Sequence, residues 1–213
     1  MKKHNRIYRL KTISSPEEIE TCERASVDVP HWTCVVRPEA CAYMGYLKGQ
    51  GLLIRLDCRE QEPKRQFRED RDPVWKDSAM EFFLAFPVQR QGEGLSNEAL
   101  YVNFEINANG VLFAQVGFGK KEREFVPERV YRECGCRAFI GPKGWTAELL
   151  VPEWYLKLLY PRWRESFFCN FYKISESPEI EHYLSYHPID SDTPNFHLPL
   201  CFARVKWDEE EKR

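Results

Sequence analysis

The chain has 213 residues and a formal net charge of −2, from 31 basic and 33 acidic side chains. A single core of this size can bury roughly 70% of the surface of the unfolded chain, so stability requires neither a metal nor a disulfide. The charge balance argues against a nucleic-acid partner, and no segment is apolar for long enough to span a bilayer, which argues against a membrane partner.

The N-terminal segment and the cysteines indicate a reducing location. The first residues, MKKHNRIYRLK, lack the apolar run of a secretory signal. The chain as given is therefore expected to be cytoplasmic, although a secreted protein whose leader had been removed would look the same. The eight cysteines show no disulfide framework and are expected to be small buried hydrophobic residues. The Cys134-Gly135-Cys136 pair is too isolated to indicate a zinc site.

In chain order, the first part is predicted to contain a strand, a short helix and three more strands. Residues 6–13 alternate in polarity and are predicted to form an edge strand. Ser15, Pro16 and Glu18 are typical of a helix start with a capping box, and the helix should end near Ala25. Residues 32–36, 40–48 and 52–60 are predicted strands bounded by prolines and glycines. The charged residues 61–73 lack strand periodicity and are expected to form a loop.

The stretch from Asp72 to Phe118 contains two alternating strands, each with one apolar and one polar face. Successive side chains of a strand point to opposite faces. On the apolar side, the first strand carries Met80 and Phe82, and the second carries Val102 and Phe104. The opposite face carries these polar side chains: Asp77, Glu81, Tyr101, Asn103, Glu105 and Asn107. Carboxylates, amides and a phenol on one face indicate a surface that hydrogen-bonds a ligand.

The turn after the second strand can close in two ways that predict different faces. A two-residue turn at Asn109-Gly110 would place Phe104 opposite Gln115, which mixes core and surface. A three-residue loop with Gly110 left-handed places Asn103 opposite Gln115 instead. It also keeps these residues on the core side: Leu112, Ala114, Val116 and Phe118. Because one face must be buried, we predict the three-residue loop.

The remainder of the chain predicts more strands and little helix. Strands are expected within 130–140 and at 145–151, 167–171 and 201–207, with one helical turn at 152–156 and loops at 87–97 and 182–195. About ten short strands, with 14 prolines, predict an all-β single domain over residues 1–213. We expect a β-sandwich of two antiparallel sheets with one short N-terminal helix. Five tryptophans are most simply core or core-edge residues: Trp32, Trp145, Trp154, Trp163 and Trp207.

Several blocks of the sequence resemble the family 9 carbohydrate-binding modules, and more closely their stand-alone bacterial relatives. The resemblance begins with Asp72-Pro73-Val74-Trp75-Lys76-Asp77-Ser78 and Glu81-Phe82-Phe83, and continues at 101–107, 170–173, 182–189 and 194–197. It implies a jelly-roll-like sandwich that binds a mono- or oligosaccharide without catalysis, between aromatic rings and beside a carboxylate and amides. Known members also carry structural calcium. The resemblance further implies a role in carbohydrate catabolism, with a partner glycosidase possible.

The resemblance assigns roles to individual residues of this chain. Trp75 matches the first stacking aromatic ring, Glu81 the hydrogen-bonding carboxylate and Asn170 an amide of a late strand. For the second aromatic ring Tyr172 and Tyr186 compete, because the 182–189 block often has Trp where this chain has Tyr186. Such a site suits sugars, which present hydroxyls at the ring edge and C–H groups on the faces.

Further candidates come from the residues themselves. Asn103 adds an amide to the polar face. Glu81 could instead be a surface carboxylate paired with Arg55 or Arg59. The two interpretations are compatible, because such an arginine would hold the carboxylate in place, and Arg55 is therefore included among the candidate site residues. Glu105 and Asn107 are more typical of structural or peripheral positions. Three acidic residues in the charged loop, Glu69, Asp70 and Asp72, have enough oxygen for calcium, although a solvated charge run is the commoner meaning.

Two other classes of protein remain open. A glycoside-processing enzyme or its accessory subunit could use Asp77, Glu81 and Glu105, since a glycosidase needs two carboxylates some 5–10 Å apart. Nothing else in the sequence marks an acid/base pair, and Ser-His-Asp chemistry lacks a nucleophile motif. The remaining class is a protein-interaction sandwich with a degenerate sugar site.

Overall fold

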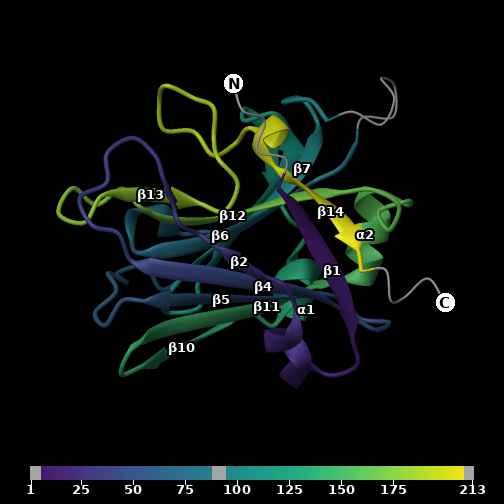
Figure 1. The fold of residues 1–213 in the computed structure, drawn as a ribbon, viewed down its shortest axis with the longest axis horizontal. Coiled ribbons are helices and arrows are strands. Elements are labelled where there is room, and N and C mark those ends of the chain that lie inside the picture. Colours follow the sequence, from purple (N-terminus) through teal and green to yellow (C-terminus); the bar gives the residue numbers. More distant parts are fainter. Residues whose placement is uncertain (1–5, 88–94, 209–213) are drawn as a thin grey trace.

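The structure is a computed structural model that describes residues 6–87 and 95–208, and its described part is built almost entirely from β-strands (Figure 1). One group of strands lies low in Figure 1: β2 (Arg24–Ser26), β4 (Glu39–Leu47), β5 (Gly51–Arg59), β10 (Arg137–Gly141) and β11 (Gly144–Pro152). The other group comprises β3 (Val29–Pro30), β6 (Ala79–Ala85), β7 (Leu100–Asn107), β8 (Leu112–Phe118), β9 (Glu122–Phe125), β12 (Phe168–Ser175), β13 (His182–Ser185) and β14 (Ala203–Trp207).

Strand β1 (Ile7–Ile13) joins these two groups into one curled sheet. The strand order is β10-β11-β5-β4-β1-β14-β12-β6-β7-β8-β9, with β2 beside β4 and β13 beside β12. The first residues of β1 pair in parallel with β14, from Ile7 opposite Arg204, and its last residues pair in parallel with β4, from Lys11 opposite Gly45. The prediction of two purely antiparallel sheets, with residues 6–13 at an edge, is therefore wrong in this detail.

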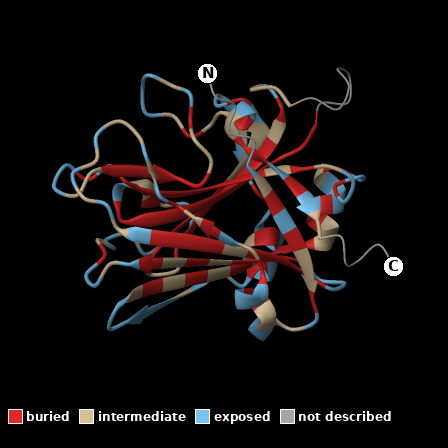
Figure 2. Ribbon diagram, viewed as in Figure 1, coloured by how far each residue is buried: buried red, intermediate tan, exposed pale blue. Residues whose placement is uncertain are grey.

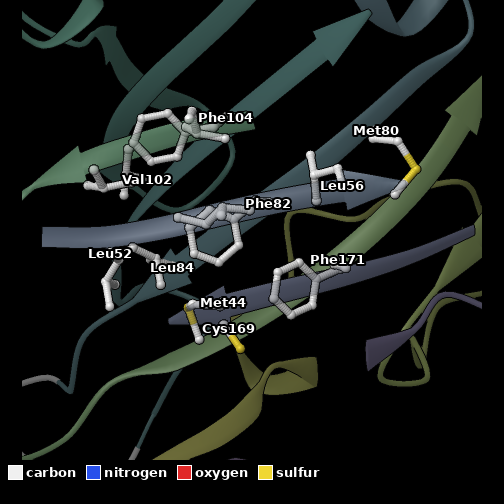
Figure 3. Packing of buried hydrophobic residues seen from close by; sticks show 14 of the residues in the cluster. Met44, Leu52, Leu56, Met80, Phe82, Leu84, Val102, Phe104, Cys169 and Phe171 are labelled. Carbon is white, nitrogen blue, oxygen red and sulfur yellow. The ribbon is translucent and has the colours of Figure 1, made fainter. Parts of the chain in front are cut away.

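The main hydrophobic core fills the space between the two halves of the curled sheet, where buried strands face one another (Figure 2). Figure 3 shows Met44, Leu52 and Leu56 from the first half near residues of the second. Phe82 stacks on Phe104 and Phe171, with ring centroids 6.2 and 5.2 Å apart. Losing such a ring typically costs about 3–5 kcal/mol, so these residues hold the two halves together.

A second apolar cluster lies on the opposite face of the second half. It includes Phe83, Tyr101, Tyr172 and Phe202 beneath the loops that follow β13. The sequence predicts a mainly polar face there, but alternation alone cannot show that loops cover part of it.

The sheet-face and register predictions for β6, β7 and β8 are confirmed. Gly110 has a φ of 80°, its N–H donates to the Asn107 carbonyl, and Asn103 lies opposite Gln115. Leu112 and Ala114 are in the core, whereas the side chain of Phe118 is exposed because the strand has passed the edge of the core.

Helices occur in more places than the sequence predicts. The N-terminal segment is a 3-10 helix, η1 (Pro16–Thr21), and Ser15 makes no side-chain capping bond. Glu18 instead accepts a hydrogen bond from the N–H of Ser14, at 3.4 Å. The other helices are α1 (Glu128–Cys134), α2 (Glu153–Leu159) and the short 3-10 turns η2 (Val74–Lys76) and η3 (Pro199–Cys201).

Most of the other predicted strands lie where the structure has them. Strands at 40–48, 52–60, 145–151 and 201–207 correspond to β4, β5, β11 and β14. Residues 32–36 form a loop rather than a strand, and 182–185 form β13 rather than a loop. Part of the predicted loop at 87–97 lies outside the described residues. All eight cysteines are free thiols, and no helix in residues 6–87 and 95–208 is long and apolar enough to cross a membrane.

Candidate functional site

A pocket of about 310 Å³ lies on the outer face of the second half of the sheet. It is lined by strand residues and by the loops around β13 and before η3. Its lining residues are Trp32, Trp75, Glu81, Glu105, Phe113, Gln115, Lys120, Arg123, Ile174, Glu176, Tyr183, Pro194, Asn195, Phe196 and His197. The structure thus brings Trp75 and Glu81, which the sequence predicts to share a site, to one pocket.

Two carboxyl groups form the polar part of the pocket floor. Glu81 of β6 lies directly opposite Glu105 of β7, and the two residues are 2% and 4% exposed. Glu105 Oε1 accepts a hydrogen bond from Asn103 Nδ2 at 2.9 Å. Glu81 Oε2 is buried and has no hydrogen-bond partner within residues 6–87 and 95–208. Burial, reinforced by the neighbouring Glu105, raises the pKa of Glu81 well above its ordinary value.

Two groups of aromatic rings flank the carboxyl pair on the same face of the sheet. On one side Trp75 packs edge-on against Phe113, with ring centroids 4.9 Å apart. On the other side Trp32 lies 5.6 Å from Phe196, which stacks on Tyr172 at 4.2 Å. The register of the sheet runs Tyr172–Glu81–Glu105–Phe113, so both carboxyls lie between the two aromatic groups.

The β8–β9 hairpin adds two cationic side chains to the pocket. Arg123 Nη1 donates to Asn103 Oδ1 at 2.6 Å, and its guanidinium lies over the Tyr101 ring. Lys120 lies in the turn and is exposed. The hairpin is tight at Gly117, where a Cβ atom would lie 1.9 Å from the Glu122 carbonyl oxygen, so this position requires glycine.

His197 completes the lining from the loop before η3. Its Nδ1 lies 3.1 Å from the Tyr101 hydroxyl. Burial, together with the nearby Arg123 and Lys120 charges, lowers the pKa of His197 well below its ordinary value. The imidazole is therefore neutral at pH 7.

Asp77 does not line this pocket, although it shares the strand face of Glu81. Its carboxylate is fully buried and accepts hydrogen bonds from the N–H groups of Gln66 and Phe67 and from Asn107 Nδ2, at 2.9–3.0 Å. Asp77 and Asn107 therefore fix the 61–73 loop, which leads directly into the turn that carries Trp75.

Three predicted site residues support the pocket from beneath rather than line it. Asn103 links Arg123 to Glu105. Asn170 holds the loop after β13, since its Nδ2 donates to the His187 carbonyl and its Oδ1 accepts from the His187 N–H. Tyr172 supports Phe196 by stacking, and its hydroxyl donates to the Phe196 carbonyl at 3.3 Å.

Two predicted site residues lie elsewhere, and these placements correct the sequence analysis. Tyr186 is in the main core, where its ring contacts Tyr8 and Phe171, because β13 ends before it and the chain turns inward. Arg55 is on β5, in the other half of the sheet, where it pairs with Asp57 and Glu20 at 3.0 Å and lines a separate pocket of about 600 Å³. It does not pair with Glu81.

The sequence analysis missed several lining residues. The sequence predicts a core or core-edge position for Trp32 and a structural or peripheral one for Glu105, whereas both line the pocket. Phe113, Arg123, Phe196 and His197 were not singled out. For Trp32 a signal existed, because a large aromatic residue two positions after Pro30 and beside His31 suits a loop as well as a strand. Glu105 and Phe113 lie on the polar faces of β7 and β8, so strand alternation could have marked them. Arg123, Phe196 and His197 come from a hairpin and a loop whose positions depend on distant contacts.

The acidic loop does not provide a calcium cluster. Asp70 Oδ1 accepts from the Leu112 N–H, and Asp72 Oδ2 accepts from the N–H groups of Arg68 and Glu69. Within residues 6–87 and 95–208, no three His, Cys, Asp or Glu side chains gather closely enough to hold a metal ion. The carboxylates of Asp70 and Asp72 thus bind backbone N–H groups of β8 and of the loop, and they do not gather with Glu69 into a metal cluster.

Fold and pocket together define an all-β binding domain whose site combines aromatic rings with buried carboxyls. Comparison with known proteins agrees with this class. The family model for carbohydrate-binding family 9 matches residues 16–207. The chain belongs to this family, and it is a non-catalytic carbohydrate-binding module rather than an enzyme.

Solved structures show the same fold at low sequence identity. A candidate carbohydrate-binding protein from Bacteroides uniformis ATCC 8492 is 20% identical, with a TM-score of 0.73, and the match covers 95% of this chain and 98% of that one. A family 9 module from Caldicellulosiruptor kristjanssonii in complex with glucose is 11% identical, with a TM-score of 0.61 and coverage of 95% and 96%. Its complex with cellotriose gives a TM-score of 0.57 at 11% identity, with coverage of 94% and 92%. No curated protein matches the chain.

Proposed function

We propose that the pocket between Trp75 and Trp32 is the carbohydrate-binding site and that it takes a glucose-type sugar. The observation that carries this proposal is the register Tyr172–Glu81–Glu105–Phe113, which sets two carboxyls between two aromatic groups. The C–H face of a sugar ring packs on an aromatic ring while its hydroxyls bond carboxyl and amide groups. The arrangement supplies both kinds of contact in one place.

The size of the pocket supports a small ligand. At about 310 Å³ it lies at the lower end of the range for small-molecule sites, ~300–1,000 Å³. One or two sugar units, or the end of a chain, suit this volume. The complexes of the Caldicellulosiruptor kristjanssonii module with glucose and cellotriose support glucose and short glucans as first ligands to test.

Trp32, rather than Tyr172 or Tyr186, is the second aromatic group of this proposed site. It is one of two non-glycine residues in the described chain with positive φ, at 46°. Such a conformation typically costs of order 1–3 kcal/mol and persists where the surroundings enforce it. Here the Trp32 Nε1 donates to the Ser191 carbonyl at 2.8 Å, and the ring packs on Tyr183 and Phe196. These contacts hold the indole at the pocket.

The test is calorimetric titration of glucose and cellotriose into wild type, Trp75→Ala and Trp32→Ala. Each substitution should remove a stacking surface worth about 1.5–3 kcal/mol, or roughly ten- to a hundredfold in affinity. Trp154→Ala is the matched control, because Trp154 lies on α2 and packs on Arg129 and Tyr155 away from the pocket. Melting curves should confirm that each variant is folded. Wild-type affinity in both pocket variants, or an equal loss in Trp154→Ala, would refute the assignment.

Three narrower proposals concern the location of the protein, its role and its architecture. Eight free thiols support a reducing, cytoplasmic location. A role as accessory to a bacterial glycosidase in carbohydrate catabolism is consistent with a sugar-binding module that has no catalytic chemistry. The crossing of β1 between the two halves supports a jelly-roll-like variant of the sandwich.

A further inference from the structure

The two carboxyls at the floor of the pocket are closer and more buried than sugar binding alone requires. Glu81 and Glu105 are direct cross-strand neighbours, which places their Cβ atoms about 4.5–5.5 Å apart. Both are at least 96% buried. Two ionised carboxylates at this separation repel each other and both lose hydration, so the ionised pair is strongly disfavoured.

The charges facing the pair do not compensate full ionisation. The charged and titratable groups around it come from six elements: Arg123 from β9, Lys120 from the β8–β9 turn, Glu176 from the segment after β12, Tyr172 and, on the opposite face, Lys173 from β12, Tyr101 from β7, and His197 from the loop before η3. Lys76 of η2, outside the pocket lining, lies near Glu176. Lys173 is matched by Glu60, at 3.6 Å, and His197 is neutral. Within the pocket lining, three carboxyls therefore face two cations, and one bound proton balances them.

The hydrogen bonds distinguish the two members of the pair. Glu105 receives a hydrogen bond from Asn103 Nδ2, and Asn103 is in turn bonded by Arg123, so negative charge is stabilised on Glu105. Glu81 Oε2 receives no such bond from the described residues. Burial raises the pKa of both carboxyls. The negative charges of Glu105 and Glu176 raise the pKa of Glu81 further, and that of Glu176 also raises the pKa of Glu105.

We propose that Glu81 and Glu105 retain a shared proton at neutral pH and present it to the sugar as a carboxylic acid at Glu81. This inference rests on the proposed function and names its ligand class: a neutral sugar with hydroxyls on neighbouring ring carbons. One hydroxyl accepts the hydrogen bond from the protonated Glu81, and its neighbour donates to Glu105. A uronic acid should bind more weakly at neutral pH, because a carboxylate placed at Glu105 would meet the negative charge that this member of the pair keeps.

The first experiment needs no sugar. Carbon-detected NMR of the side-chain carboxyls in wild type, titrated from pH 4 to 10, should show that the pair keeps a proton at pH 7. The signals are assigned with Glu81→Gln and Glu105→Gln. Ionisation of both carboxyls below pH 6 would overturn the inference and leave the proposed sugar site standing.

The second experiment measures affinity for glucose and glucuronate across the same pH range. Glucose affinity should be constant near neutrality and fall by up to about tenfold per pH unit once the shared proton is lost. Glucuronate should bind at least tenfold more weakly than glucose at pH 7. Affinity for glucose that stays constant or rises past the pH at which the NMR titration shows the proton leaving would refute its role in sugar binding. An absence of binding of any neutral sugar at every pH would instead refute the proposed function.

Variants separate the proton from the carboxylate. Glu81→Gln keeps an N–H donor without a titrating proton, so it should bind glucose within a fewfold of wild type at pH 7 and lose the pH dependence. Glu124→Gln is the matched control, since Glu124 is exposed on β9 beside Arg123 and outside the pocket lining, and its pH profile should be that of wild type. A Glu81→Gln profile identical to wild type would contradict the assignment. If that variant does not fold, the NMR titration of wild type still decides.

Discussion

Asp77 and Glu81 show how two carboxyl groups on one strand face can have opposite roles. Asp77 accepts three hydrogen bonds and fixes a loop. Glu81 lies four residues later and is also buried, but it lines the pocket. Its Oε2 has no hydrogen-bond partner among the described residues. Sequence parity places both on the same face but cannot distinguish them, because the donors to Asp77 come from a loop with no periodic pattern.

The burial of Glu81 predicts a pH dependence of stability. Its pKa in the folded state is raised above the ordinary value near 4.5, so between that pH and the raised value the folded state binds more protons than the unfolded state. The free energy of unfolding should therefore fall as pH rises from about 4.5 through neutrality. Glu81→Gln removes this cost, and we expect the variant to be more stable than wild type at pH 9 by about 1–3 kcal/mol, with little difference at pH 4.5.

Urea denaturation at the two pH values measures this effect. Asp77→Asn is the control, because replacing an acceptor of three hydrogen bonds should reduce stability at pH 9 rather than increase it. Equal urea midpoints for wild type and Glu81→Gln at both pH values would show that the Glu81 carboxyl is not destabilised by its burial.

At the scale of elements, strand positions were predictable and the loops that complete the pocket were not. Alternation predicted which faces of β6, β7 and β12 carry Glu81, Asn103 and Asn170, and the buried-face argument fixed the β7–β8 register. The position of Trp32 depends instead on contacts about 150 residues apart, such as the His31 N–H donating to the Tyr183 carbonyl. A sequence pattern with local range carries no information on such contacts.

A buried ionic cluster links β11, β12 and β13 to the residues that flank β5 and β6, and it gives an element-scale prediction. Lys173 of β12 is fully buried, and its ammonium donates to Ser78 Oγ and to His182 Nε2. It lies 3.6 Å from Glu60 Oε2, which also accepts from Trp145 Nε1. Removing one member of a buried pair leaves an uncompensated charge and typically costs 3–5 kcal/mol.

We expect Glu60→Gln to lower the free energy of unfolding by about 3 kcal/mol, because the substitution removes the carboxylate that pairs with the buried Lys173. Adding Lys173→Met to Glu60→Gln should restore much of the loss. Chemical denaturation of the two single variants and the double variant gives the coupling energy. Additive losses in the double variant would mean that the two charges do not depend on each other.

At the scale of the whole molecule, the all-β class was predictable from many short strands. The strand order that joins both halves along one curled path was not. β1 reaches that path by pairing with β14, almost 200 residues away, and with β4. The Tyr8 hydroxyl strengthens the crossing, since it accepts from the Met44 N–H at 2.7 Å and donates to the Glu23 carbonyl. A strand whose partners are both remote in sequence gives no local signal of its place in a sheet.

The eight thiols test the packing of the whole domain. Five are buried, at Cys22, Cys41, Cys58, Cys134 and Cys169, and three are partly exposed, at Cys34, Cys136 and Cys201. Burial raises the pKa of Cys22 to about 11 and that of Cys58 to about 12, which lowers the fraction of reactive thiolate at pH 8.

Burial also raises the pKa of the Cys136 thiol strongly, although this residue is partly exposed. We therefore expect brief alkylation of the native protein at pH 8 to label Cys34 and Cys201 first, and denaturing alkylation without reductant to label all eight. Intact mass counts the added groups, and peptide mapping identifies the cysteines. A sample reduced before denaturation is the control and should give the same total. Fewer labels without reductant than with it would reveal disulfides and contradict the proposed reducing location. Rapid labelling of Cys58 or Cys169 in the native protein would show that the core between the two halves opens readily.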